Sequence, residues 1–204
     1  MAQVAHAESS AAGHLETNTG LDNRKLLMWL FLGSECLFFG SLISAYLLYR
    51  DRSVVGPYPA DLYDIPFTSV SSFILLMSSL SMVLALAAIQ RGNVRNMRIW
   101  LLCTALLGTL FIGGQAFEFT EFYREGLHLD TNLFGTTFYV LTGFHGAHVT
   151  VGVLILLSIV AASFKGRVNS EEDALTVELA GLYWHFVDIV WIVIFTLVYL
   201  VEPT

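Results

Sequence analysis

Charged side chains are scarce in this sequence. Only 13% of its 204 residues are Asp, Glu, Lys or Arg, whereas soluble globular domains carry about 25%. Hydrophobic residues make up 55% of the chain. A chain with so few charges cannot cover a large surface in contact with water. The composition therefore indicates a membrane protein with short loops, and it excludes a sizeable soluble domain.

An excess of positive charge is also missing. The formal net charge is −7 at pH 7. A negative chain is repelled by phosphate backbones and gains nothing from anionic lipid surfaces. We therefore expect no nucleic-acid partner and no attachment to a membrane through a basic patch.

Cysteine is nearly absent. Cys36 and Cys103 each stand alone in a different apolar segment. The chain has no paired-cysteine motif for attaching haem or for building a dinuclear copper site, so both cysteines are interpreted as packing residues. A glycine-rich phosphate loop, a nucleophile elbow and a metalloprotease helix are missing too. The sequence contains no complete active site.

Long apolar runs are what the chain has in abundance. Five segments reach the length of about 20 residues that a helix needs to cross the hydrocarbon core. They cover about residues 26–49, 66–90, 98–123, 133–164 and 175–201, and Pro66 is well placed as the first helical residue of the second. We expect an all-α bundle of five transmembrane helices over residues 24–204. Residues 1–23 lack the basic start and apolar core of a signal peptide and are predicted to form a flexible polar tail.

The basic residues predict how the bundle is oriented. One set of connecting segments carries Arg24, Lys25, Arg91, Arg95, Arg98, Lys165 and Arg167, and the other carries Arg50, Arg52 and Arg124. Basic residues collect on the cytoplasmic side of membrane proteins, so the N-terminus is predicted to be cytoplasmic and the C-terminus outside. Trp29, Trp100 and Tyr199 lie near helix ends, where aromatic side chains anchor a helix at the interface.

Small residues predict where the helices touch. Segment 66–90 contains six serines, which allow close approach and can hydrogen-bond across an interface. Segment 98–123 carries Ala105, Thr109 and Gly113 at every fourth position, and Gly143 and Gly146 flank a histidine in the next segment. We expect Gly113, Gly143 and Gly146 to be helix-packing positions.

Six ionisable positions stand out within the apolar segments and are therefore functional candidates. They are Glu35, Glu118, His145, His148, His185 and Asp188. Glu35 is near mid-bilayer and allows two interpretations. It is a functional carboxyl that handles protons or faces lipid, or it is a buried structural group. Glu118 is near the outer end of its segment, so a structural or solvated role is expected.

The three histidines allow several interpretations. His145 and His148 are three residues apart on one helix face, a spacing that can bind a metal or help to bracket a haem. The glycines around them equally favour hydrogen bonding across a close helix contact, and a proton relay is a further alternative. His185 and Asp188 share a helix face as well. They could form a pair that orients a metal ligand, or a buried polar contact to the facing helix, with His145 or His148 as partner, or to another subunit.

Four stretches in order resemble subunit III of the haem-copper terminal oxidases in its short five-helix bacterial form. They read WLFLGSECLFFGSL in the first segment, GQAFEF in the third, FYVLTGFHGAHVTVG in the fourth and LYWHFVDIVWIVIFTLVYL in the fifth. The resemblance covers residues 26–201.

The resemblance implies a subunit of an oxidoreductase complex that reduces oxygen and pumps protons, and implies that this chain carries no catalytic centre, metal or haem of its own. In this family haem and copper belong to subunits I and II. Subunit III assembles with them in the bacterial plasma membrane, and the oxidase can in turn be part of a larger respiratory supercomplex. The family binds phospholipid and supports proton uptake. Glu35 matches the family's intramembrane glutamate. His145 and His148 match its histidine motif, and His185 and Asp188 match its WHFVD motif.

The long form of the family has two further N-terminal helices that build one wall of a lipid cleft. This sequence lacks them, so we expect such a cleft only if another subunit supplies that wall. The alternatives within the family are a quinol oxidase and a nitric-oxide-reductase accessory protein. Alternatives of another class are an independent haem- or metal-binding membrane protein and a proton channel.

Overall fold

The computed structural model describes residues 22–50, 52, 56 and 64–201. Its elements are α1 (Asn23–Tyr49), α3 (Ile65–Ile89), α4 (Val94–Arg124), α5 (Leu133–Phe164), a 3₁₀ turn η1 (Glu171–Asp173), α6 (Ala174–Phe195) and a π-helical turn η2 (Thr196–Leu200). Over the described residues five helical spans are long and apolar enough to cross a membrane, and no strand is present. The predicted all-α, five-span architecture is confirmed.

The predicted boundaries need three changes, the first being that α1 begins at Asn23, three residues before its predicted start. The third helix begins at Val94, four residues before the predicted start, because the Asn93 side chain accepts a hydrogen bond from the Asn96 amide and caps a polar first turn. The last span is not one regular α-helix, since it ends in η2. The predicted tail falls outside the described residues, except that Asp22 caps α1 and Asn23 is its first residue.

Side-chain caps start α1, α3 and α5 in the same way. Asp22 accepts from the Arg24 amide at 2.8 Å, Asp64 from the Phe67 amide at 3.1 Å, and Asn132 from the Gly135 amide at 2.7 Å. The first amides of a helix have no partner within the helix, so such caps stabilise and locate its start. Pro66, predicted as a first-turn residue, lies in the first turn of α3.

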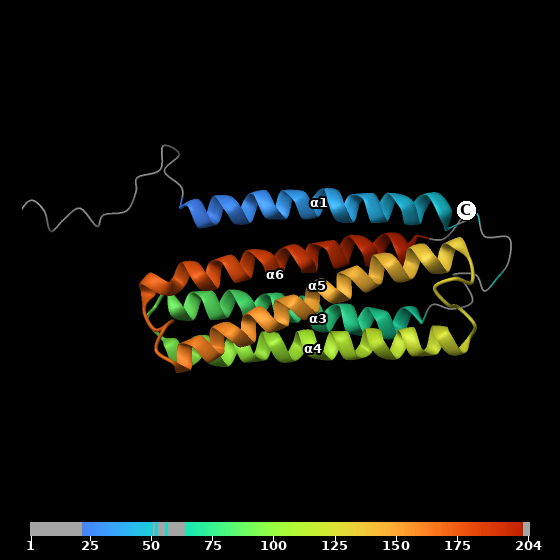
Figure 1. The fold of residues 1–204 in the computed structure, drawn as a ribbon. Coiled ribbons are helices and arrows are strands. Elements are labelled where there is room, and N and C mark those ends of the chain that lie inside the picture. Colours follow the sequence, from blue (N-terminus) through green and yellow to red (C-terminus); the bar gives the residue numbers. More distant parts are fainter. Residues whose placement is uncertain (1–21, 51, 53–55, 57–63, 202–204) are drawn as a thin grey trace, which may run out of the picture.

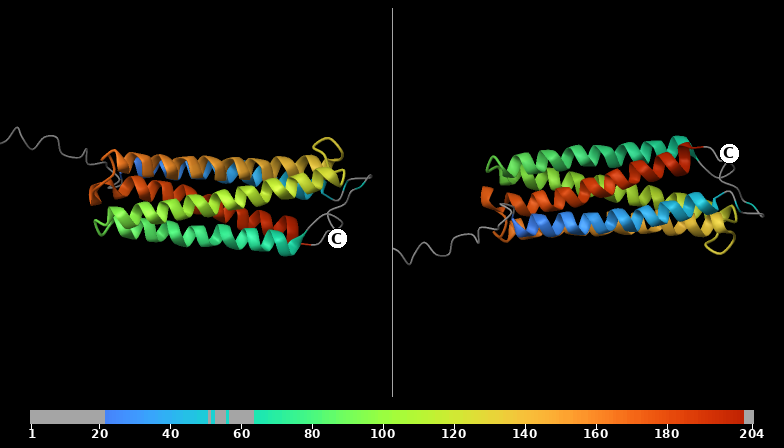
Figure 2. Two further views of the ribbon diagram at one scale, coloured as in Figure 1. Left: turned by 90° about the horizontal axis from the view of Figure 1, so that it is seen from below. Right: turned by 90° about the horizontal axis from the view of Figure 1, so that it is seen from above.

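Four helices form the body of the molecule, and α1 lies along one side of it (Figure 1). Helix α4 packs between α3 and α5, and α6 packs against both α3 and α5. Helix α1 contacts α5 and α6. Viewed from above, α6 runs between α1 and α3 (Figure 2). Helices α5 and α6 together therefore join α1 to the rest of the bundle.

The two ends of the bundle differ in charge. The end at which α1 starts also carries the α3–α4 and α5–α6 connections (Figure 1). We call this the basic end, because it holds Arg24, Lys25, Arg91, Arg95, Arg98, Lys165 and Arg167. We call the other the acidic end; it holds Asp64, Glu118, Glu121, Glu125 and Asp130. The structure thus groups the seven basic residues as predicted, while the side of the membrane that they face stays a prediction.

Arginine side chains tie the helix ends together. At the basic end Arg98 of α4 donates to the Ser163 hydroxyl and carbonyl, both at 2.7 Å, and lies over the Phe164 ring at 4.4 Å. This satisfies a carbonyl in the last turn of α5. At the acidic end Arg50 donates to the Leu197 carbonyl of η2 at 3.2 Å, which joins the end of α1 to the end of the last span.

Two tryptophans of α6 form the centre of the packed core. Trp184 and Trp191 are almost completely buried, and their indole nitrogens donate to Ser78 at 2.9 Å and Ser72 at 2.8 Å. The Trp184 ring lies between α4 and α5, where a Cβ added at Gly108 or Gly152 would approach it to 2.5 Å and 2.8 Å. Serines on α3 and glycines on α4 and α5 thus create the space and the acceptors that two large indoles need.

Candidate functional site

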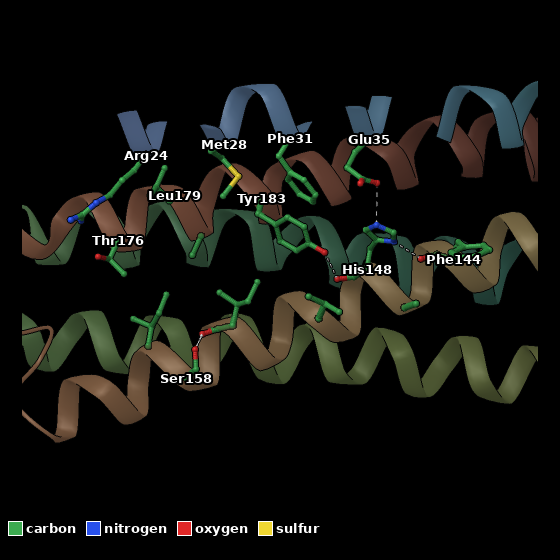
Figure 3. Close-up of a pocket in the computed structure, with 15 residues that line it drawn as sticks. Arg24, Met28, Phe31, Glu35, Phe144, His148, Ser158, Thr176, Leu179 and Tyr183 are labelled. Atoms are coloured by element: carbon green, nitrogen blue, oxygen red, sulfur yellow. Dashed lines mark hydrogen bonds and ion pairs between the residues drawn. The ribbon is translucent and has the colours of Figure 1, made fainter. Parts of the chain in front are cut away.

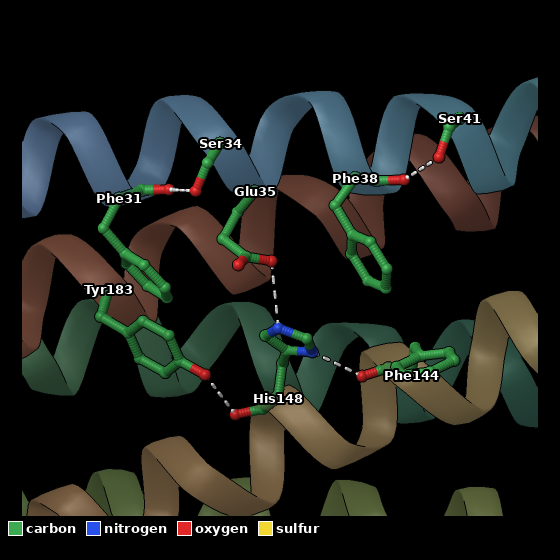
Figure 4. A network of polar contacts seen from close by, with 8 residues as sticks. All are labelled: Phe31, Ser34, Glu35, Phe38, Ser41, Phe144, His148 and Tyr183. Atoms are coloured by element: carbon green, nitrogen blue, oxygen red, sulfur yellow. Dashed lines mark hydrogen bonds and ion pairs between the residues drawn. The ribbon is translucent and has the colours of Figure 1, made fainter.

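Glu35 of α1 and His148 of α5 meet inside the membrane-spanning part of the bundle (Figure 4). Glu35 Oε2 lies 3.2 Å from His148 Nε2, and the two side chains are only 16% and 20% exposed. The contact is close enough for an ion pair, but it does not have the alignment of a good hydrogen bond. Sequence alone placed both residues in the membrane, but it did not pair them.

The backbone of α5 determines which His148 nitrogen carries a fixed proton. Nδ1 lies 2.7 Å from the carbonyl oxygen of Phe144, one turn earlier in the helix. A carbonyl can only accept, so Nδ1 carries the proton and donates. Nε2 is therefore the ring nitrogen that faces the Glu35 carboxyl.

An apolar cavity of about 760 Å³ opens beside this pair, between α1, α5 and α6 (Figure 3). Arg24 lines it near the basic end, and Glu35 with His148 lines it deeper in the bundle. Between them the lining is mainly hydrophobic and includes Met28 and Phe31. The cavity has the form expected for an apolar molecule or an acyl chain.

Tyr183 of α6 supports this arrangement. Its hydroxyl donates to the backbone carbonyl of His148 at 3.0 Å, and its ring stacks on Phe31 with centroids 6.3 Å apart (Figure 4). One side chain thus holds the cavity wall of α6 against both α1 and α5. Sequence reasoning missed Tyr183. The sequence offered one signal for it. Tyr183 lies in the same span as the predicted His185–Asp188 pair, one helical turn before Val187.

The three membrane histidines do not come together. His145 is fully buried, with Nε2 3.2 Å from the Val187 carbonyl of α6 and its ring stacked on Trp191 at 4.8 Å. His148 faces Glu35, and His185 shares a hydrogen bond of 2.6 Å with Ser79 of α3. In the described part of the chain no group of three or more His, Cys, Asp or Glu is arranged to hold a metal ion.

His185 and Asp188 have a different partner from the one expected. The sequence pointed to His145 or His148 on α5, but both His185 and Asp188 lie beside Ser79 of α3. Asp188 is 3% exposed, and neither carboxylate oxygen forms a hydrogen bond of normal geometry among the described residues. The correction follows from the rotation of α6, which aims this face toward α3 and its other face toward α5.

Glu118 joins three elements at the acidic end. Its two carboxylate oxygens accept from Thr68 of α3 at 2.8 Å and from Tyr199 of η2 at 3.1 Å. Tyr199 is buried, so its predicted role as an exposed interface anchor is wrong. The π-helical turn places the Tyr199 hydroxyl inward. There it contacts the Glu118 carboxylate and does not face the membrane surface.

The three predicted packing glycines have different surroundings. A Cβ added at Gly146 would lie 2.5 Å from Gln115 Oε1, and Gln115 in turn donates to the Thr142 carbonyl at 2.7 Å. At Gly113 and Gly143 no heavy atom of a facing element lies within 4 Å of such a Cβ. These two positions therefore do not pack against another helix within the described part of the chain. Gly108 and Gly152 do so instead.

Comparison with known proteins agrees with the sequence motifs. The family model for cytochrome c oxidase subunit III matches residues 4–202. The chain is 38% identical over 187 residues to cytochrome c oxidase subunit 3 of Bacillus sp. (strain PS3), covering 91% of this chain and 90% of that protein.

Two further relatives extend the comparison. Cytochrome c oxidase subunit 3 of Synechocystis sp. (strain ATCC 27184 / PCC 6803 / Kazusa) is 43% identical over 182 residues, covering 88% of this chain and 76% of that protein. Quinol oxidase subunit 3 of Bacillus subtilis (strain 168) is 35% identical over 200 residues, covering 98% and 97%. With five membrane spans and a family match over nearly its whole length, this chain belongs to the cytochrome c oxidase subunit III family and is a multi-pass membrane subunit of a haem-copper oxidase complex.

Proposed function

We propose that this chain is a subunit without redox centres that packs beside subunits I and II of a bacterial respiratory oxidase in the plasma membrane. Within that complex it stabilises the assembly, binds phospholipid, and supports proton uptake through Glu35. The observation that carries this proposal is the Glu35–His148 pair at the deep end of an apolar cavity.

The pair is suited to holding and releasing one proton. Because His148 Nδ1 is occupied by the Phe144 carbonyl, any proton gained or lost moves between Nε2 and the Glu35 carboxyl. An isolated intramembrane charge is costly, and a neighbour that can share the proton lowers that cost. A redox role for the pair itself is not required, since neither side chain cycles electrons.

The cavity is suited to a lipid. Arg24 provides a cationic group near the basic end for a phosphate, and the apolar wall beyond it accommodates an acyl chain that ends near Glu35. This cavity lies within one chain, between α1, α5 and α6. It therefore needs no contribution from two further N-terminal helices of the kind that the long form of the family has.

Purification of the native complex in mild detergent tests the assignment. We expect the chain to co-purify with proteins that contain haem and copper. A dicopper centre in the accompanying subunit II identifies cytochrome c as electron donor, and a subunit II without it identifies quinol. Recovery of the chain alone with stoichiometric haem or metal, or pH-dependent proton flux in liposomes that contain only this chain, would overturn the proposal.

The role of Glu35 is tested by Glu35→Gln, with Glu121→Gln as the control. Glu121 is an exposed glutamate paired with Arg124 at the acidic end, so its replacement removes a carboxylate away from the cavity. We expect the Glu35→Gln oxidase to assemble normally but to take up protons more slowly and lose activity faster during sustained turnover. Equal proton uptake and equal durability of both variants and wild type would leave Glu35 with a structural role alone.

A further inference from the structure

A second cavity opens at the acidic end of the bundle, where α4 ends and its connection to α5 begins (Figure 1). Its volume is about 460 Å³, and none of its described lining residues is shared with the cavity beside Glu35. The lining comes from α4, the connection and the start of α5, and it consists of Phe119, Thr120, Tyr123, His128, Leu129 and Tyr139. Most of this wall is therefore made of aromatic rings.

The rings are arranged as two edge-to-face pairs. Phe119 packs against Tyr139 with ring centroids 5.1 Å apart and ring planes at 76°. Tyr123 packs against His128 with centroids 4.3 Å apart and planes at 66°. The face of an aromatic ring carries partial negative charge. Several rings at steep angles to one another therefore form a wall that attracts a cation.

Hydrogen bonds hold the α4–α5 connection in place around the cavity. The Tyr139 hydroxyl donates to the Leu127 carbonyl at 2.9 Å, and the His128 amide donates to the Thr131 hydroxyl at 2.9 Å. The lining is thus positioned before any ligand arrives. A site that is already in place loses less conformational freedom on binding than one that must first be ordered.

The charge around the cavity also favours a cation. The described lining contains no lysine, arginine, aspartate or glutamate. Glu125 caps the end of α4 and Asp130 lies in the connection, and neither forms an ion pair within the described part of the chain. The Arg124 guanidinium is already paired with Glu121 at 2.7 Å. An anion would meet net negative charge at this site, whereas a cation would be attracted.

The lining indicates which kind of cation fits. A metal ion or a primary ammonium needs several oxygen ligands to replace its water shell. No carboxylate or amide side chain is part of the described lining, and no group of three or more His, Cys, Asp or Glu is arranged to hold a metal ion there. A quaternary ammonium has no N–H to satisfy and exposes only methyl groups. It is the cation that aromatic walls recognise without further ligands.

We propose that this cavity binds a quaternary ammonium group, held by cation–π attraction to Tyr123 and the rings around it. Two sources share this chemistry. One is the trimethylammonium headgroup of a lipid, because the cavity lies at the end of the membrane spans, and the other is a free molecule such as choline. The site goes beyond the proposed function, since it involves neither Glu35 nor the cavity beside it.

A matched pair of probes tests the role of the charge. The intact oxidase complex is placed in nanodiscs of phosphatidylglycerol, a lipid without an ammonium group. Binding of choline is compared with that of 3,3-dimethylbutan-1-ol, in which a neutral carbon replaces the charged nitrogen, by saturation-transfer NMR of the methyl protons. We expect choline to bind and the neutral probe to bind at least several-fold more weakly. Equal binding would show an apolar cavity without preference for a cation and would overturn the proposal.

A second set of nanodiscs, which contain phosphatidylcholine, separates the two sources. If choline binding disappears there, the lipid headgroup already fills the site. If choline binding is unchanged, a free molecule is the ligand. Both results support a quaternary ammonium site. Absence of choline binding in the phosphatidylglycerol nanodiscs contradicts it.

Substitution of Tyr123 assigns the binding to this cavity, with Phe73→Leu as the control. The Tyr123 and Phe73 side chains are similarly exposed, at 65% and 60%, but Phe73 of α3 does not line the cavity. We expect Tyr123→Leu to weaken choline binding about two- to fivefold, the effect of losing one cation–π contact at an exposed site. Tyr123→Trp keeps a ring with a stronger attraction for cations and should bind choline at least as tightly as wild type.

The amount of this chain in each purified complex is measured first, so that a lost site is distinguished from a lost subunit. Wild-type choline affinity in a fully assembled Tyr123→Leu complex would reject the site. An equal loss of affinity in Phe73→Leu would reject it as well, because the effect would then not depend on the cavity. Neither result would affect the oxidase assignment, which depends on the proteins that co-purify.

Discussion

The seam between α1 and the rest of the bundle differs from the interfaces among α3, α4, α5 and α6. Helix α1 buries one narrow stripe, Leu32, Phe39 and Tyr46, whose members are seven residues apart. Around Trp184, by contrast, the indole ring lies so close to Gly108 and Gly152 that neither position has room for a Cβ. One seam relies on large side chains over a single line of contact, and the other on small residues around an enclosed indole.

The difference shows where function can be located. Inside the membrane, a helix gains no hydrophobic free energy by contacting another helix in place of lipid tails. Tight association of helices therefore depends on close packing and hydrogen bonds. The tryptophan interfaces use both. The α1 seam leaves a cavity of about 760 Å³ and places its Glu35–His148 pair beside it. Stability is concentrated in one region, and the ionisable pair with its accessible space lies in the other.

The largest contrast is expected between Gly108→Val and Gly33→Val. At Gly108 a new side chain collides with the rigid Trp184 ring, whereas at Gly33 no neighbour lies within 4 Å of an added Cβ. Overpacking of this kind costs about 1–3 kcal/mol or more. We expect a clear drop in the unfolding midpoint of Gly108→Val in detergent and almost none for Gly33→Val. Equal midpoints would show that the Trp184 interface is not tightly packed.

A smaller contrast is expected between Gly146→Leu and Gly143→Leu, three residues apart on α5. A side chain at Gly146 must displace Gln115 and break its bond to the Thr142 carbonyl, while Gly143 faces open space within this chain. We expect a loss of about 1–2 kcal/mol at Gly146. The measurement is the unfolding midpoint of the isolated subunit together with the amount retained in the complex. Loss of retention for Gly143→Leu alone would instead indicate a partner contact at that position.

The smallest effect is expected at the ion pair between Lys25 of α1 and Glu178 of α6, which joins the two helices at the basic end. Both side chains are about one-third exposed, so water and salt screen their attraction. Glu178→Gln should cost about 0.2–1 kcal/mol, and less at high salt. A larger, salt-independent loss in the unfolding midpoint would mean that α1 depends on this pair for its position.

Much of the fold could be predicted because hydrophobic length and helix caps are local signals. The five spans, the first-turn position of Pro66 and the family were predicted and are confirmed. The start at Val94 was missed because the first turn of α4 is polar and resembles a loop. The role of Tyr199 was wrong because η2 turns its hydroxyl toward Glu118, and a π-helical turn has no clear sequence signal.

The pairing of the polar groups could not be predicted from the same signals. Glu35, His145, His148, His185, Asp188 and Glu118 were all identified as candidates, but their partners come from other helices. Ser79, Tyr183 and Gly108 were not singled out, since serine, tyrosine and glycine are ordinary components of membrane helices. Their importance depends on what faces them.

The sequence by itself determined that this chain crosses a membrane five times, which residues lie in those spans, and to which family it belongs. The tertiary structure decided that Glu35 meets His148, that His185 meets Ser79, and that Trp184 lies between two glycines. The reason is physical. Membrane helices are apolar on nearly all sides, so their periodicity does not reveal how each is rotated about its axis. That rotation is determined by close packing and hydrogen bonds between helices, which only the assembled bundle provides.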